Sequence, residues 1–341
     1  MSKTNAGRFF EDYRMGETLV HAVPRTLSGG ERALYHALYP ARHAVTSSDS
    51  FARSLGLPQA PLDPLIVFHT VFGKTVPDVS LNAVANLGYA QGRFLRPVYP
   101  GETLRAMSEV IGLKENSSGK SGIVWVRTRG LSGGAVVLDY VRWVMVHKRA
   151  PDTKTGETNV PQLAGSVPAE ALVVPEDLSF DGYDTTLAGE PHLWADYSIG
   201  ETIDHVDGVT LEDAEHMMAT RLWQNTAKVH FDATARPDGR RLIYGGHIIS
   251  LAHALSFNGL ANVQMMVAIN GGTHANPAFA GDTLRAWSEV LDKAETSVPG
   301  VGAIRLRLVA TKGEPFLLRG ADGRYLPEVL LDFDYWALMK R

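Results

Sequence analysis

An internal repeat is the feature of this sequence that most restricts its fold. Residues 12–19, Asp-Tyr-Arg-Met-Gly-Glu-Thr-Leu, return at 196–203 as Asp-Tyr-Ser-Ile-Gly-Glu-Thr-Ile. Residues 101–110 return at 281–290 with the shared core Thr-Leu-Arg-Ala, and residues 138–140 match residues 331–333. Three matches in the same order indicate a duplicated domain rather than a chance likeness.

The stretch between the two copies differs in composition from both. Residues 151–190 are polar and carry Pro151, Pro161, Pro168 and Pro175, a pattern typical of a connector. We therefore expect an N-terminal repeat over residues 1–150, a connector over 151–190 and a C-terminal repeat over 191–341.

Within each copy, one apolar helix precedes strands with partial alternation of polar and apolar residues. In the second copy the helix is expected over residues 248–260. Residues 123–129 and 304–308 are predicted to be corresponding strands, and residues 139–147 and 332–339 the last strand of each copy. One long helix with a run of antiparallel strands predicts an α+β domain in which the helix packs on the sheet.

Composition excludes several classes of protein. The chain has 341 residues, of which 45% are hydrophobic and 21% charged, as expected for a globular protein with a sizeable core. A net charge of −4 without basic clusters argues against a nucleic-acid partner. The absence of cysteine excludes disulfides and thiolate ligands. No stretch resembles a membrane span or a signal peptide, so the expectation is a cytoplasmic protein without a membrane partner.

The stretch from Thr210 to residue 251 combines features of a catalytic site. Thr210 is predicted to cap a helix that runs to Trp223, and a polar segment over 224–232 follows. Gly245 and Gly246 then open the apolar helix. Backbone N–H groups at such a helix start attract negative charge, so this pattern favours a site where a carbonyl becomes an oxyanion.

Two segments carry a resemblance to a known family. Residues 94–104, Phe-Leu-Arg-Pro-Val-Tyr-Pro-Gly-Glu-Thr-Leu, and residues 244–251, Tyr-Gly-Gly-His-Ile-Ile-Ser-Leu, resemble the MaoC-like hot-dog enoyl-CoA hydratases. The duplication is similar to their double hot-dog form. The resemblance implies a tandem hot-dog fold, in which an antiparallel sheet wraps a central helix in each half. It further implies a hydro-lyase that reversibly adds water to a short, branched C4-dicarboxylic acyl-CoA thioester, in acetyl-CoA or glyoxylate assimilation. Coenzyme A would be part of the substrate, no other cofactor is expected, and a homo-oligomer is expected.

The family motif Asp-x-Asn-Pro-x-His-x-Asp is only partly present. His230 occupies the histidine position and Asp232 the last position, whereas Asn225 replaces the first aspartate. The resemblance thus implies His230 as general base toward water, Asn225 as the group that orients the water, and Asp232 as the nearest substitute for the second proton carrier. Thr46 and Ser48 hold the histidine and last positions in the first copy, so the second copy is expected to carry the chemistry.

Substrate-binding residues are expected near this motif. The backbone of Gly245 and Gly246 would polarise the thioester carbonyl, and Arg221 or Lys228 would bind the free carboxylate of the acyl group; Arg42 and His43 are weaker candidates. No residue pattern suggests a metal site.

Each of these residues also has a purely structural explanation. His230 could be a surface histidine before a turn, Asn225 a helix cap, and the glycines a means of close packing. Two other functions stay open: a hot-dog acyl-CoA thioesterase and a non-catalytic acyl-CoA-binding protein.

Overall fold

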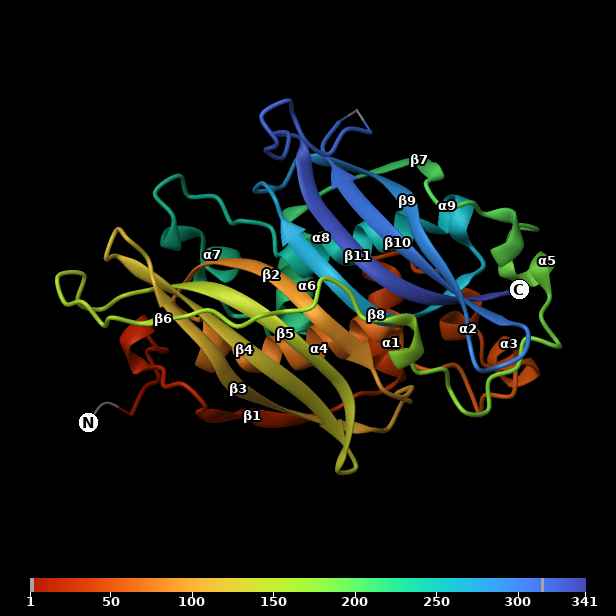
Figure 1. Ribbon diagram of the computed structural model, residues 1–341, viewed down its shortest axis with the longest axis horizontal. Coiled ribbons are helices and arrows are strands. Elements are labelled where there is room, and N and C mark those ends of the chain that lie inside the picture. The colour runs from red at the N-terminus through yellow and green to blue at the C-terminus, as the bar shows by residue number, and fades with distance from the viewer. Residues whose placement is uncertain (1–2, 314–315) are drawn as a thin grey trace.

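Eleven strands form one antiparallel sheet in the computed structural model, which describes residues 3–313 and 316–341. The strand order is β1-β3-β4-β5-β2-β8-β11-β10-β9-β7, so the five strands of each copy occupy one half of the sheet (Figure 1). The first half contains β1 (Thr18–Thr26), β2 (Ala83–Phe94), β3 (Thr103–Glu115), β4 (Ser121–Ser132) and β5 (Ala135–His147). The second half contains β7 (Thr202–Thr210), β8 (Val263–His274), β9 (Thr283–Glu295), β10 (Val301–Thr311) and β11 (Val329–Lys340). The predicted strands at 123–129, 304–308, 139–147 and 332–339 are confirmed.

The two halves join where β2 pairs with β8. Tyr89 lies opposite Gly272, and Arg93 lies opposite Ala268. A Cβ atom on Gly272 would lie 2.8 Å from the ring of Tyr89, so the small residue permits this pairing. The two copies therefore share backbone hydrogen bonds.

Two apolar helices lie behind the sheet in the view of Figure 1, α4 (Pro64–Thr75) in the first copy and α8 (Gly245–Leu255) in the second. Every residue of α4 is buried. His69 of α4 and Ser250 of α8 are joined by a 2.7 Å hydrogen bond between Nε2 and Oγ. Apolar side chains from both copies form one continuous core around these helices.

Shorter helices surround this core: α1 (Gly29–Leu38), α2 (Ala44–Ser47), α3 (Asp49–Ser54), α5 (Thr185–Ala188), α6 (Asp213–Leu222), α7 (Lys228–Phe231) and α9 (Phe257–Leu260). None of the helices among the described residues is long and apolar enough to cross a membrane.

The stretch between the copies is packed rather than loose. It contains β6 (Thr158–Asn159), which pairs with β3, and α5. Leu178 and Phe180 are buried, and the carbonyl of Val167 accepts a 3.1 Å hydrogen bond from the indole of Trp336. The stretch therefore packs first against β3 of the first copy and then against the second copy, and it is not a loose spacer.

Two helix boundaries differ from those predicted. Thr210 ends β7, where its hydroxyl lies 2.9 Å from that of Thr283, and α6 begins later with Glu212 as N-cap. The Thr210 cap was wrong because its hydroxyl is used in a cross-strand pair. The apolar helix begins at Gly245 and stops at Leu255, and regular helix does not reach the predicted end at Leu260 because Asn258 (ψ 101°) and Gly259 (φ +97°) have non-helical dihedral angles.

Candidate active site

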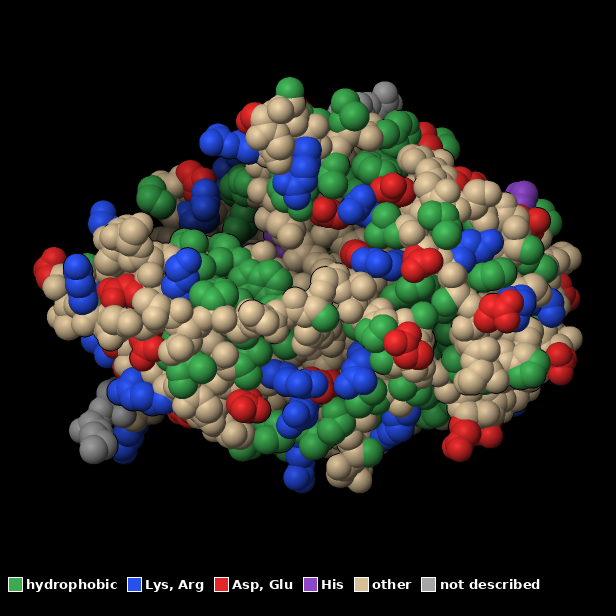
Figure 2. Space-filling model, viewed as in Figure 1, with side chains coloured by type: hydrophobic (Ala, Val, Ile, Leu, Met, Phe, Trp, Pro, Cys, Tyr) green, Lys and Arg blue, Asp and Glu red, His purple; other side chains and the backbone are tan. Residues whose placement is uncertain are grey.

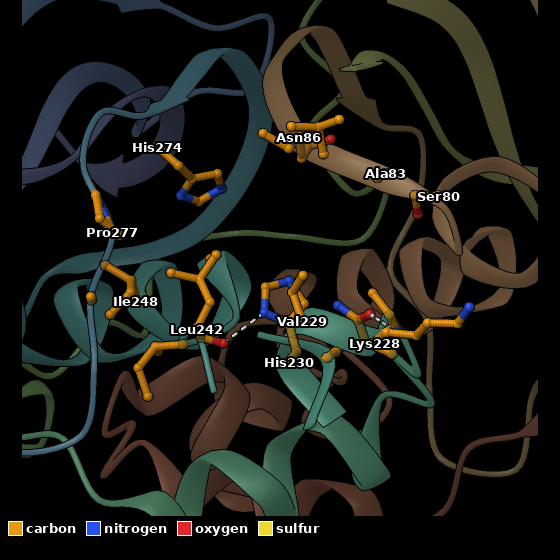
Figure 3. Close-up of a pocket in the computed structure, with 18 of the residues that line it drawn as sticks. Ser80, Ala83, Asn86, Lys228, Val229, His230, Leu242, Ile248, His274 and Pro277 are labelled. Atoms are coloured by element: carbon orange, nitrogen blue, oxygen red, sulfur yellow. Dashed lines mark hydrogen bonds between the residues drawn. The ribbon is translucent and has the colours of Figure 1, made fainter. Parts of the chain in front are cut away.

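A cavity of about 500 Å³ lies between the two copies, at the start of α8. On the face drawn in Figure 2 the surface is hollowed at this place. One wall comes from the first copy and the other from the second (Figure 3). The first-copy wall includes Phe72, residues 80–86 and His147, and the second-copy wall includes Asn225, residues 227–230, Leu242, Ile243, Gly245, Ile248 and residues 274–278.

His230 lies in α7 and lines the cavity with a fixed orientation. Its Nδ1 is 2.7 Å from the carbonyl oxygen of Leu242, which can only accept, so Nδ1 carries the proton (Figure 3). Nε2 is consequently left with a free lone pair. The ring is half-buried, and this burial lowers the pKa of His230 although the bond to Leu242 opposes the shift. A neutral imidazole with an unprotonated nitrogen at the cavity can accept a proton from water.

Asn225 contributes a buried carboxamide to the same cavity. Its backbone N–H donates to the carbonyl of Thr220 at 2.9 Å and so ends α6. Its side chain is 1% exposed and lines the cavity, with Oδ1 accepting from the backbone of Ala227 at 3.3 Å. The backbone of Asn225 thus has a structural role while its carboxamide can contact a ligand.

The start of α8 supplies free backbone donors. Gly245 and Gly246 are its first two residues, and their N–H groups have no acceptor within the helix. The N-cap residue Tyr244 gives no side-chain cap. Gly245 lines the cavity, whereas Gly246 lies against Tyr244 and is absent from the lining among the described residues. The geometry therefore favours the Gly245 N–H as the donor to an oxyanion.

Tyr244 holds this helix start in place through two histidines. Its backbone N–H donates to Nε2 of His216 at 2.9 Å, and its hydroxyl lies 3.2 Å from Nδ1 of His69. Burial lowers the pKa of both histidines to about 3, so both are neutral at pH 7 and His216 can accept the bond.

His274 is a cavity residue that the sequence analysis missed. It ends β8, and its Nε2 is 3.1 Å from the hydroxyl of Tyr89 in the first copy. Burial, and secondarily the neighbouring His230, lowers its pKa to about 4. A Cβ atom on Gly245 would lie 2.3 Å from the His274 ring, so the two residues are in close contact. Comparison of the two copies could have identified it, because the last residue of β2 at the corresponding position is the apolar Phe94 whereas β8 ends with a histidine.

Three residues predicted from the sequence to act in the site have exposed side chains. Asp232 is exposed, and Oδ1 accepts from the backbone and hydroxyl of Thr234 at 2.9 and 2.7 Å. Arg221 is exposed on α6, and like Asp232 it is not among the described residues that line the cavity. Lys228 lines the cavity, but its side chain is exposed. The fold therefore brings His230, Asn225, Gly245 and Lys228 together at the cavity, whereas Asp232, Arg221 and Gly246 lie outside its described lining.

At the corresponding place in the first copy, the described residues enclose a much smaller space. A void of about 20 Å³ lies at the start of α4, where Pro64 replaces Gly245 and has no N–H to donate. Phe94 stands in place of His274, and Met265 and Met266 of β8 fill the facing wall. In α2, Thr46 at the position of His230 donates to the carbonyl of His43. Among the described residues, the proposed base His230, the free N–H of Gly245 and the cavity of about 500 Å³ thus come together at the start of α8, in the second copy.

Within the described part of the chain, no three or more carboxylate or histidine side chains are grouped so that they could hold a metal ion.

Comparison with known proteins agrees with this architecture. A protein named mesaconyl-CoA hydratase from Cereibacter sphaeroides is 74% identical over 99% of this chain and 100% of its own length. A protein named β-methylmalyl-CoA dehydratase from Chloroflexus aurantiacus is 57% identical over 100% of this chain and 99% of its own.

Solved structures give the same result. A putative MaoC domain dehydratase from Chloroflexus aurantiacus superposes with a TM-score of 0.96 at 57% identity, covering 100% and 99% of the two chains. A Mycobacterium tuberculosis protein with a double hotdog fold superposes with a TM-score of 0.78 at 25% identity, covering 97% and 98%. The predicted tandem hot-dog fold is thus confirmed.

A family model described as mesaconyl-CoA hydratase matches residues 1–315. This match and the two full-length relatives confirm the predicted hydro-lyase family, and they do not favour the thioesterase or binding-protein alternatives. The chain belongs to the mesaconyl-CoA hydratase family.

Proposed function

We propose that this chain catalyses the reversible addition of water to mesaconyl-CoA (2-methylfumaryl-CoA), which gives β-methylmalyl-CoA. The observation that carries the proposal is the joint position of His230 and the start of α8 at one cavity. A hydratase needs a base for water and a donor for the thioester oxygen, and these two elements supply them. The printed names of the two full-length relatives support the substrate.

In the proposed reaction, Nε2 of His230 takes a proton from water as the oxygen bonds to the β-carbon of the acyl group. Electrons of the conjugated double bond move to the thioester oxygen. The backbone N–H of Gly245 then donates to that oxygen as it becomes negative, and the positive end of α8 adds to the effect. The carboxamide of Asn225 holds the attacking water beside the base.

The same imidazole can complete the reaction. Once protonated, His230 returns its proton to the α-carbon, the thioester carbonyl re-forms, and H and OH have been added without a net change in the enzyme. A second proton carrier is then unnecessary, which agrees with the position of Asp232 outside the cavity.

The proposal extends to cofactor, location and assembly. The reaction requires no group beyond the coenzyme A of the substrate, and we place it in the cytoplasm. A homo-oligomer is supported by the two outer strands of the sheet: Val20 and Val23 of β1 and Val206 of β7 are 80%, 68% and 64% exposed. Sedimentation of the purified chain would test the assembly.

The central test is a paired measurement on His230→Ala. Hydration of mesaconyl-CoA, followed by loss of the conjugated thioester absorbance, should fall about 100- to 10,000-fold, as for loss of a general base. The melting temperature should change little, because the half-buried ring makes one hydrogen bond, worth on the order of 1 kcal/mol. Asn225→Ala should lose less activity than His230→Ala.

A normal rate in His230→Ala would remove this residue from the mechanism. Release of free coenzyme A by the wild-type protein, instead of β-methylmalyl-CoA, would identify a thioesterase. Binding without turnover would identify an acyl-CoA-binding protein.

A further inference from the structure

Arg142 of β5 is a fully buried cation without an anionic partner. Its side chain is 0% exposed, and its guanidinium carbon lies 4.3 Å from the ring centre of Phe72. Nη2 donates to the hydroxyls of Thr75 at 2.6 Å and Ser80 at 3.4 Å, while Nε and Nη1 have no partner. Among the described residues no carboxylate lies within ion-pair distance of it. An uncompensated buried charge is costly, so its retention calls for an explanation.

This cation lies directly behind the first-copy wall of the cavity. Phe72 and Ser80, which contact the guanidinium, both line the cavity. On the far side, the ring of Phe72 lies 5.9 Å from that of Tyr244, which lies 5.8 Å from His230. The rings of Phe72 and Tyr244 thus lie between Arg142 and the proposed base. Because these surroundings are apolar, the charge of Arg142 is weakly screened over this distance.

A second unpaired polar group stands on the same wall. Both polar atoms of the Asn86 side chain are buried without a hydrogen-bond partner, and the residue lines the cavity. Figure 3 shows Asn86, Ala83 and Ser80 along the side of the cavity opposite Val229 and His230. Buried amide groups are nearly always paired, so Asn86 is a candidate to bind a ligand group.

The duplication shows that these polar residues are specific to the wall of the open cavity. The corresponding positions in the second copy are Leu260 for Ser80, Met266 for Asn86 and Tyr335 for Arg142. Met266 lines the closed void at the start of α4. None of the three positions therefore keeps its polar group type in the second copy, and the counterpart of Asn86 is an apolar residue at the closed void.

We propose that Arg142, Ser80 and Asn86 form a carboxylate subsite that binds the free carboxylate of the acyl group. The inference rests on the proposed function and names the feature that selects a dicarboxylic acyl-CoA over a monocarboxylic one. The Ser80 hydroxyl accepts from Arg142 and donates its own proton to the carboxylate, and the Asn86 amide donates a second hydrogen bond. Arg142 is thus a positioning residue that acts through Ser80.

The structure of the substrate explains why a carboxylate subsite near His230 would be needed. In mesaconyl-CoA the free carboxylate is attached to the β-carbon, which is the carbon that water attacks. A subsite across the cavity from His230 would hold this carbon beside the base. Arg221, expected from the sequence to bind the carboxylate, lies outside the cavity, and Lys228 is an exposed alternative.

The test compares two ligands that cannot be hydrated and that differ in one group. Succinyl-CoA carries a carboxylate where butyryl-CoA carries a methyl group, and calorimetry gives both dissociation constants without any turnover. Wild-type protein should bind succinyl-CoA about 100-fold more tightly, since polar sites reject apolar analogues strongly. Arg142→Met should reduce this ratio to about 3 or less, and Arg142→Lys should give an intermediate ratio.

Matched variants complete the design. Arg105→Met removes the same charge from the exposed face of β3 and should keep the wild-type ratio. Ser80→Ala and Asn86→Met should each lower the ratio by weakening succinyl-CoA binding alone. These two variants decide the question if Arg142→Met does not fold, because both leave the buried cation in place.

The possible outcomes distinguish failure of the proposed reaction from failure of the carboxylate subsite. If wild-type protein does not hydrate mesaconyl-CoA but Arg142→Met still abolishes the ratio, the proposed reaction fails and the subsite stands. A folded Arg142→Met protein with the wild-type ratio overturns the subsite, as does an unchanged ratio in both Ser80→Ala and Asn86→Met. Loss of the ratio in Lys228→Met but not in Arg142→Met would assign the carboxylate to Lys228 and overturn it as well.

Discussion

His230 and Asp232 are two residues apart in the sequence, yet the fold gives them different surroundings. Nδ1 of His230 is held by the carbonyl of Leu242, which fixes the tautomer and leaves Nε2 at the cavity. Asp232 instead begins a 3₁₀ turn over Ala233–Ala235 and accepts two hydrogen bonds from Thr234. The motif spacing therefore leads to His230, the proposed base at the cavity, but not to a carboxylate beside it.

This difference predicts the behaviour of Asp232→Asn. Asparagine is as good an N-cap as aspartate, so the turn should persist, and no proton carrier should be lost from the cavity. We expect hydration rates within about twofold of wild type and a nearly unchanged melting temperature, since such surface changes shift stability by about 0.5 kcal/mol at most. A hydration rate at least 100-fold below that of the wild type, with an unchanged melting temperature, would show that Asp232 takes part in the mechanism.

At the scale of elements, the sequence predicted the central helix and the strands well and the site only in part. Periodicity and the repeat identified several strands because part of each of them alternates between buried and more exposed residues, as in β3 and the second half of β4. The start of α8 was predicted from Gly245 and Gly246, although only Gly245 faces the cavity. His274 and Arg142 were missed because their partners, Tyr89 and Ser80, are distant in sequence and meet them only in the fold.

The start of α8 yields a prediction for Gly245→Ala. The added Cβ would lie 2.3 to 2.7 Å from three atoms of the His274 ring, so either the ring or the helix start must shift. A displaced oxyanion donor is expected to lower kcat about 100-fold, as removal of one such donor does. The measurement is kcat for mesaconyl-CoA hydration together with a thermal melt.

Gly29→Ala is the matched control, because Gly29 is also the first residue of a helix and has open space around it. It should keep wild-type kcat. Equal rates in Gly245→Ala and wild type would show that the helix start need not be close-packed against His274.

At the scale of the whole molecule, duplication has produced two walls with different tasks. The second copy holds the proposed base and oxyanion donor, and the first copy supplies Phe72, Ser80 and Asn86 to the same cavity. Backbone pairing of β2 with β8 and the shared core keep these walls together. The site therefore depends on both copies although only one carries the motif.

The shared core also contains neutral histidines, which should make folding sensitive to acid. Burial lowers the pKa of five fully or almost fully buried histidines to about 3 for His69 and His216 and to about 4 for His205, His247 and His253. Their unfolded pKa is 6.5, so the unfolded chain binds more protons below that pH. The stability that depends on their neutral form is complete above pH 6.5 and is lost as the pH falls toward 4.

One buried carboxyl opposes this trend. Burial raises the pKa of Asp63 to about 6 from 3.8, so in this range the folded chain retains a proton that the unfolded chain releases. For these five histidines and Asp63 taken together, the net uptake on unfolding near pH 5 is about four protons, on the order of 5 kcal/mol per pH unit. Because domains are stable by about 5–15 kcal/mol, we expect unfolding within one to three pH units below 6.5.

Thermal melts from pH 7.5 to pH 4.5 would measure this dependence, and His253→Leu provides the decisive comparison. His253 is buried with Nδ1 unpaired, so leucine removes one titrating group at little cost in hydrogen bonding. The melting temperature of His253→Leu should fall less steeply with pH, because this variant takes up about one proton fewer on unfolding than the four of the wild type. His192→Gln changes an exposed histidine and should keep the wild-type slope. Identical slopes in His253→Leu and wild type would mean that the buried histidines do not govern the acid limit of the fold.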